Sequence, residues 1–150
     1  SGPRGMSEPA AIAPQTIASV ITELAEDFAM LDEWEDRYRH VIDLGRKLTP
    51  WPEDDRHEAE RVAGCQSRVW LRAEPRDGRL HFRAASDSSI VQGLLALILS
   101  VYDSRRPAEI LAQGPEFLTA LGLSEHLSLS RRNGVSAVLG RIRAAATAAG

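Results

Sequence analysis

The sequence predicts a single α+β domain in which helices cover one face of a small antiparallel β-sheet. Apolar residues recur at helical spacing over residues 16–30 and 32–48. Two segments, 68–73 and 79–84, then alternate apolar and polar residues, which is typical of strands. From residue 88 onward the patterns are helical again. Two helices, two strands and further helices in this order are typical of an α+β domain.

The first two helices are predicted from their apolar faces. The first is expected from Thr16 to Met30. Asp32 is expected to cap the second, with Glu35 and Asp36 in its first turn, where negative charge favours the helix dipole. The apolar positions are Ile17, Val20, Ile21, Leu24, Ala25 and Phe28 in the first helix, and Trp34, Tyr38, Val41, Ile42 and Leu48 in the second.

A charged loop and a hairpin are predicted next. Residues 49–57 hold two prolines and a group of charges, which favours a loop. After it, Val69, Leu71 and Ala73 alternate with polar or aromatic neighbours in the first strand. The Asp77-Gly78 pair supplies the positive φ that a tight hairpin needs, and the second strand follows.

The remaining segments predict four helices. The helix at about 88–102 is apolar on most sides and should be the buried central one. Short helices are expected over 107–112 and 115–121, and the last helix is expected to begin at Ser130 or Asn133, with its inward side chains at Val135, Val138, Leu139 and Ile142. Residues 1–5 are expected to be a remnant of an expression tag, and 1–15 a flexible lead-in to one domain over 16–150.

Composition and charge narrow the class of protein. The net charge is −3, with an acidic first part of the chain and a basic remainder, which favours a protein partner attracted by charge. Scattered arginines and few aromatic residues argue against nucleic acid, and the most apolar segment is too short to span a bilayer. A single cysteine forms no intramolecular disulfide, and the start of the chain shows no secretory signal, so we expect a cytoplasmic protein.

Cys65 is the only cysteine, and its neighbours leave two interpretations open. A lone cysteine usually packs as a small buried hydrophobe. However, Gly64 removes steric cover, and flanking Arg61 and Arg68 favour the reactive thiolate. A cysteine-dependent hydrolase or transferase would also need a histidine such as His57 or His81. The cysteine and histidines show no metal-ligand spacing, so no metal site is expected.

Four segments together resemble the SufE family of sulfur-acceptor proteins. They are YRHVIDLGRKL (38–48), VAGCQSRVWL (62–71), SDSSIVQGL (86–94) and EHLSLSRRNG (125–134), and the resemblance covers about 34–145. It implies a SufE-like two-layer sandwich. It also implies that the chain takes persulfide sulfur from a pyridoxal-phosphate cysteine desulfurase (SufS- or CsdA-like) onto Cys65, stimulates that enzyme, and passes the sulfur to an iron–sulfur scaffold or another acceptor.

The resemblance further implies site residues and cofactor use. Cys65 would be the acceptor, and Gly64, Gln66 and Ser67 would form its loop. Asp87 matches a position that holds the resting loop, with a helix cap as the alternative. Arg131 matches an arginine of the partner-facing surface, with a solvated charge as the alternative. The chain would bind no cofactor itself, since the pyridoxal phosphate belongs to the desulfurase, and it would be an accessory protein rather than an enzyme.

Overall fold

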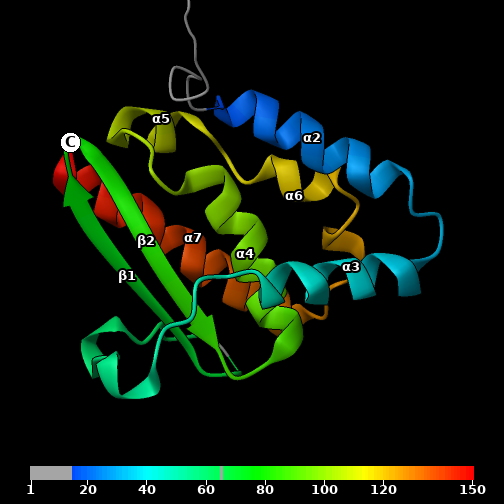
Figure 1. Cartoon of the computed structure of the whole chain (residues 1–150), viewed down its shortest axis with the longest axis horizontal. Coiled ribbons are helices and arrows are strands. Elements are labelled where there is room, and N and C mark those ends of the chain that lie inside the picture. The colour runs from blue at the N-terminus through cyan, green and yellow to red at the C-terminus, as the bar shows by residue number, and fades with distance from the viewer. Residues whose placement is uncertain (1–14, 65) are drawn as a thin grey trace, which may run out of the picture.

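The helices form one layer of the molecule, and a two-stranded hairpin lies against them (Figure 1). The structure is a computed structural model that describes residues 15–64 and 66–150. The described helices are α2 (Ile17–Ala29), α3 (Trp34–Arg46), α4 (Ser89–Tyr102), α5 (Pro107–Ala112), α6 (Glu116–Ala120) and α7 (Leu129–Ala149). The short 3-10 turns are η2 (Glu53–Asp55), η3 (Glu58–Glu60) and η4 (Ser124–His126). The strands are β1 (Val69–Arg76) and β2 (Arg79–Ser86). The predicted α+β class is confirmed. The lead-in up to residue 14 lies outside the described residues.

The hairpin is antiparallel and ends in a two-residue turn. Its register pairs Val69 with Ser86 at one end and Arg76 with Arg79 at the other. Asp77 and Gly78 have φ values of 54° and 77°. Positive φ at both central residues defines the type I′ turn, whose twist matches that of the strands. The predicted Asp-Gly turn is therefore confirmed.

Helix α4 is the centre of the core, as its sequence predicts. Its side chains are buried around most of its circumference, and Leu95, Leu97 and Ile98 are each 1% exposed. Burying one such side chain contributes roughly 1.5–3 kcal/mol. Helix α3 packs closely against α4 because Gly45 and Gly93 bring the two backbones together.

The main differences from the sequence-based helix boundaries lie at α3 and α7. The cap of α3 is Glu33 rather than Asp32, and the helix ends at Arg46, so Leu48 lies beyond it. Helix α7 begins earlier than expected, at Leu129, because the Ser128 hydroxyl accepts a hydrogen bond from the Arg131 amide. A serine that satisfies a free amide of the first turn is a strong helix start.

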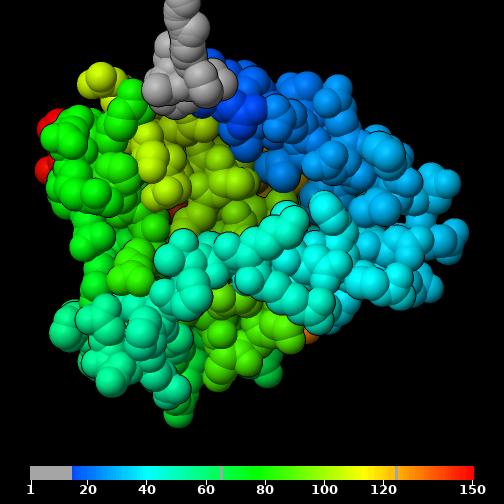
Figure 2. Space-filling view, in the orientation of Figure 1, coloured from blue at the N-terminus to red at the C-terminus, as the bar shows by residue number. Residues whose placement is uncertain are grey.

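The outer face of the hairpin is also covered, which the strand pattern does not predict. Trp70, on the face expected to be polar, is 8% exposed and forms a separate small cluster with Trp51 and Ala85. Figure 2 shows residues 50–61 (teal) lying over this part of the hairpin. Ala73, on the face expected to be buried, is exposed.

Helix α7 runs along the hairpin from the end that the loop joins to the turn. Its C-cap, Gly150, lies beside the hairpin turn, where Gly78 and Leu80 share a hollow with it (Figure 1). Its first turn lies at the opposite end, where Ser130 contacts Gln66. None of the described helices is long and apolar enough to cross a membrane.

Candidate functional site

The site is the loop that joins η3 to β1 and contains Cys65. Cys65 itself lies outside the described residues, so the site is built from the chain on either side of it. Gly64 has a φ of +89°, a left-handed conformation that disfavours any other residue. A Cβ at this position would lie 3.7 Å from the Ala137 Cβ of α7, an ordinary contact. Glycine is therefore required here by the backbone conformation rather than by lack of space.

The segment before Cys65 is fixed to both β1 and α7. The Val62 amide donates to the Val69 carbonyl at 2.8 Å. From α7, the Arg141 guanidinium donates to the carbonyls of Arg61 at 3.1 Å and Ala59 at 3.2 Å. The Val62 side chain is buried in the main core. These contacts hold the backbone in place close to Cys65.

The segment after Cys65 is fixed by Asp87 and α7. The Asp87 carboxylate accepts a hydrogen bond from the Arg68 amide at 3.1 Å. Asp87 is not the cap of α4, since the Ser88 hydroxyl accepts from the Val91 amide. Asp87 therefore contacts the backbone that leads from the loop into β1, and its role in holding the resting loop stays a prediction.

Gln66 links the same segment to the start of α7. The Ser130 hydroxyl donates to the Gln66 side-chain oxygen at 2.7 Å. Because Ser130 lies in the first turn of α7, the polar residue that follows Cys65 lies close to the positive end of that helix.

A cavity of about 320 Å³ lies beside the loop. Gln66 and Ser67 line it from the loop, and Arg131 lines it from the first turn of α7. Its apolar walls come from α4 and α7 and include Val91, Leu94, Leu95, Ile98, Val135 and Val138. The cavity can hold a small apolar group, and polar side chains lie along its loop side.

A second, more open hollow lies on the same side of the molecule. Gly64, Gln66, Leu129, Ser130 and Asn133 line it. Leu129 is 66% exposed, which is high for a leucine.

His81 lies away from the end of the hairpin that the loop joins. His81 pairs with Glu74 in the hairpin, whereas the loop joins the end at which Ser86 pairs. Strand geometry puts about 17 Å between residues 81 and 86. The His81 ring also contacts the Ser104 hydroxyl at 3.1 Å. His57 precedes η3 as its cap, and its amide donates to the Glu60 carboxylate.

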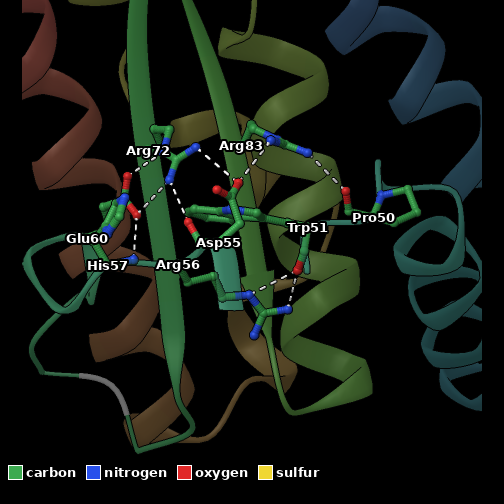
Figure 3. Close-up of polar contacts among 8 residues, drawn as sticks. All are labelled: Pro50, Trp51, Asp55, Arg56, His57, Glu60, Arg72 and Arg83. Atoms are coloured by element: carbon green, nitrogen blue, oxygen red, sulfur yellow. Dashed lines mark hydrogen bonds and ion pairs between the residues drawn. The ribbon is translucent and has the colours of Figure 1, made fainter. Parts of the chain in front are cut away.

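A polar cluster on the outer face of the hairpin borders the chain that leads to the loop (Figure 3). Arg72 of β1 forms an ion pair with Glu60 of η3 and a second one with Asp55. The hydrogen bond from Arg72 is the main cause that lowers the pKa of Glu60 below 4.5, while burial opposes it. The sequence-based expectations did not include this cluster, and the available signal was the presence of Trp70 and Arg72 on one face of β1.

Among residues 15–64 and 66–150, no group of three or more acidic, histidine or cysteine side chains could hold a metal ion. The described residues of the site make polar and apolar contacts around the loop that joins η3 to β1. They anchor the described residues on both sides of Cys65 and form a cavity next to them.

Comparisons with known proteins identify relatives over most of the chain. The family model SufE, described as an Fe-S metabolism associated domain, matches residues 22–146. An uncharacterized SufE-like protein of Rhizobium meliloti (strain 1021) is 40% identical over 131 residues, covering 84% of this chain and 94% of the relative. The sulfur acceptor protein CsdE of Escherichia coli (strain K12) is 41% identical over 124 residues, covering 81% and 84%.

The fold is shared with a solved structure. The solution structure of a hypothetical protein from Thermus thermophilus matches with a TM-score of 0.72 and 24% sequence identity. The match covers 87% of this chain and 95% of that one. The fold match therefore extends over nearly the whole of both chains.

Proposed function

Because the chain belongs to the SufE family of Fe-S metabolism associated domains, we propose that it is a sulfur acceptor and carrier that uses Cys65. The observation that carries the proposal is a family match over residues 22–146, which includes the only cysteine of the chain. The 41% identity to a sulfur acceptor protein supports it. The donor is a pyridoxal-phosphate cysteine desulfurase, and the recipient is an iron–sulfur scaffold or another acceptor.

The transfer step needs one thiolate and no net oxidation. The Cys65 thiolate attacks the outer sulfur of the donor's persulfide and forms a new sulfur–sulfur bond. The donor's own sulfur–sulfur bond breaks, and the donor cysteine leaves as a thiolate, as in thiol–disulfide exchange. The proton of the outer sulfur travels with it, so Cys65 becomes a persulfide. A single cysteine is sufficient for this step.

The surroundings of the loop support this chemistry. The positive end of the α7 dipole lies close to Gln66, and Arg131 lines the adjacent cavity. Positive charge near a cysteine favours its thiolate. We propose that the 320 Å³ cavity shelters the persulfide between acceptance and delivery, because apolar side chains of α4 and α7 form part of its walls and reduce contact with the solvent.

A partner surface next to Cys65 is also part of the proposal. The donor persulfide must reach the loop, so the desulfurase has to cover the surface around it. The hollow that contains exposed Leu129 lies there. The chain would act as an accessory protein that accelerates the desulfurase. We expect it to work in the cytoplasm, where thiols stay reduced.

Sulfide release by a cysteine desulfurase of the same organism tests the proposal. With cysteine and a reductant present, the wild-type chain is expected to accelerate release. Cys65→Ser is expected to fold like the wild type and to give no acceleration, because the attacking thiolate is missing. Equal acceleration by Cys65→Ser would refute the carrier role.

A further inference from the structure

We propose that Arg72 is a positioning residue for sulfur transfer, because it ties the chain that precedes Cys65 to the strand that follows it. The inference rests on the proposed function. Arg72 lies in β1, after the loop, and Glu60 ends η3, before the loop. The Arg72 Nε and Nη2 groups both donate to the Glu60 carboxylate, the latter at 3.2 Å. Such a forked pair fixes both distance and orientation.

Asp55 extends the same connection. Arg72 Nη2 donates to the Asp55 carbonyl at 2.8 Å, and Nη1 lies 3.4 Å from the Asp55 carboxylate. The Asp55 carboxylate also pairs with Arg83 of β2 at 3.7 Å. The Arg72 guanidinium therefore contacts both η2 and η3 on the outer face of the hairpin, and Arg83 adds a second contact to η2 (Figure 3).

Trp51 packs against that guanidinium. The Arg72 Cζ lies 4.9 Å from the centre of the Trp51 ring, and Trp51 is 3% exposed. The ring and the carboxylates together determine where the arginine fork can lie. A lysine ammonium carries the same charge but has no planar fork, so it would restore only part of this arrangement.

The tie acts on the chain that contains Cys65. Joining residues 60 and 72 closes the segment between them, and a closed segment has fewer conformations than a free one. Within this segment, the hydrogen bond from the Val62 amide to the Val69 carbonyl holds the chain against β1 two residues before Gly64. Losing the Arg72 contacts should therefore increase the motion of the segment that carries the acceptor.

The cluster is separate from the main core, so its effect on the loop can be distinguished from an effect on folding. Trp51, Trp70 and Ala85 form their own small cluster, apart from the core around α4. Glu60 and Arg72 pair on the outside of β1, where the side chains are partly exposed. Removing this pair should leave the packing of α4 unchanged.

The test compares Arg72→Met with Arg76→Met. Both residues lie on the same face of β1, since side chains two or four apart share a face, but Arg76 is exposed. Amide hydrogen exchange is measured at Val62 and along α4, and the single-turnover rate of sulfur transfer is measured with saturating persulfide-loaded desulfurase. Glu60→Gln and Arg72→Lys are included.

For Arg72→Met we expect faster exchange at Val62, unchanged exchange in α4, and transfer slowed roughly tenfold, the scale of a small misplacement of a reacting group. Arg76→Met should match the wild type, and Arg72→Lys should recover part of the rate. The double variant Glu60→Gln, Arg72→Met should transfer sulfur no more slowly than Arg72→Met alone, because both substitutions remove the same ion pair.

Two results would overturn the inference. One is an Arg72→Met chain that transfers sulfur at the wild-type rate. The other is exchange that rises equally at Val62 and in α4, which would mean a general loss of stability. A wild-type chain that accepts no sulfur would instead contradict the proposed function, so the two failures are distinguishable.

Discussion

Alanine substitution at two helix glycines should change stability in opposite directions. A Cβ added to Gly93 of α4 would lie 2.1 Å from the Val41 carbonyl oxygen and 2.6 Å from the Val41 carbonyl carbon. Both are backbone atoms of α3, so a change of side-chain rotamer cannot relieve the clash. A Cβ at Gly140 of α7 would meet no atom within 4 Å. The two positions are both in helices, and they differ in the space that is available to an added Cβ.

The expected magnitudes follow from these distances. In a helix interior, alanine is favoured over glycine by about 1 kcal/mol. Overpacking a core by one carbon typically costs about 1–3 kcal/mol, and a clash with backbone belongs at the upper end of that range or beyond it. Gly93→Ala should thus lower the free energy of unfolding by about 2 kcal/mol or more. Gly140→Ala should raise it by up to about 1 kcal/mol.

Urea unfolding monitored by circular dichroism measures both changes. The midpoint should fall for Gly93→Ala and rise for Gly140→Ala, with an unchanged dependence on urea concentration if the unfolded ensemble is the same. In thermal unfolding, a difference of about 1 kcal/mol corresponds to about 2–4 °C for a domain of this size. A Gly93→Ala chain as stable as the wild type would refute the close approach of α3 and α4.

Three further predictions concern the helix start, acid stability and docking. Ser128→Ala should lower the free energy of unfolding by about 1 kcal/mol because α7 loses its cap, whereas the same substitution at exposed Ser136 should change it little. Equal effects of the two substitutions in urea titrations would contradict the capping role. The arginine partner of Glu60 lowers the pKa of this carboxylate below 4.5, so the ion pair contributes to the free energy of unfolding above that pH and is lost as the pH falls through the folded-state pKa. The stability difference between the wild type and Glu60→Gln should therefore shrink below pH 4.5. A difference that stays constant with pH would be evidence against the pairing. Leu129→Glu should weaken stimulation of the desulfurase. Met30→Glu is the control, because Met30 is 80% exposed on another surface, and it should leave the stimulation unchanged. Matching stimulation curves for the two variants would rule out docking at Leu129.

The sequence predicted those parts of the fold that local patterns determine. The Asp77-Gly78 turn, the buried helix α4 and the short helix α5 were all found because turn chemistry, apolar content and a leading proline act within a few residues. The start of α7 was misplaced because Ser128, Ser130 and Asn133 can all cap a helix, and exposed Leu129 gives no inward-facing pattern.

The outer face of the hairpin could not be predicted in the same way. Residues 50–61 contain prolines and many charges, and this composition is typical of a solvated loop. Their position over the strands depends on pairing with Arg72 and Arg83, and one sequence does not show which distant residues meet. Arg141 was missed for the same reason, since its contacts are with carbonyl groups far away along the chain.

The candidate site was identified through the motif around Cys65, and the structure adds its surroundings. Asp87 lies against the loop, Gln66 contacts the start of α7, and Arg131 lines the neighbouring cavity. The cavity is formed by α4 and α7 together, so neither segment shows it alone. The role of Cys65 as acceptor stays a prediction.

The measurement that tests the central claim most directly is the mass of the Cys65 peptide after incubation with a cysteine desulfurase and cysteine. The sample is alkylated without prior reduction and digested, so that a persulfide is retained. The proposal predicts one additional sulfur atom on the peptide that contains Cys65, and none on the same peptide when the desulfurase is omitted. A Cys65 peptide of unchanged mass, while the desulfurase itself carries a persulfide, would contradict it.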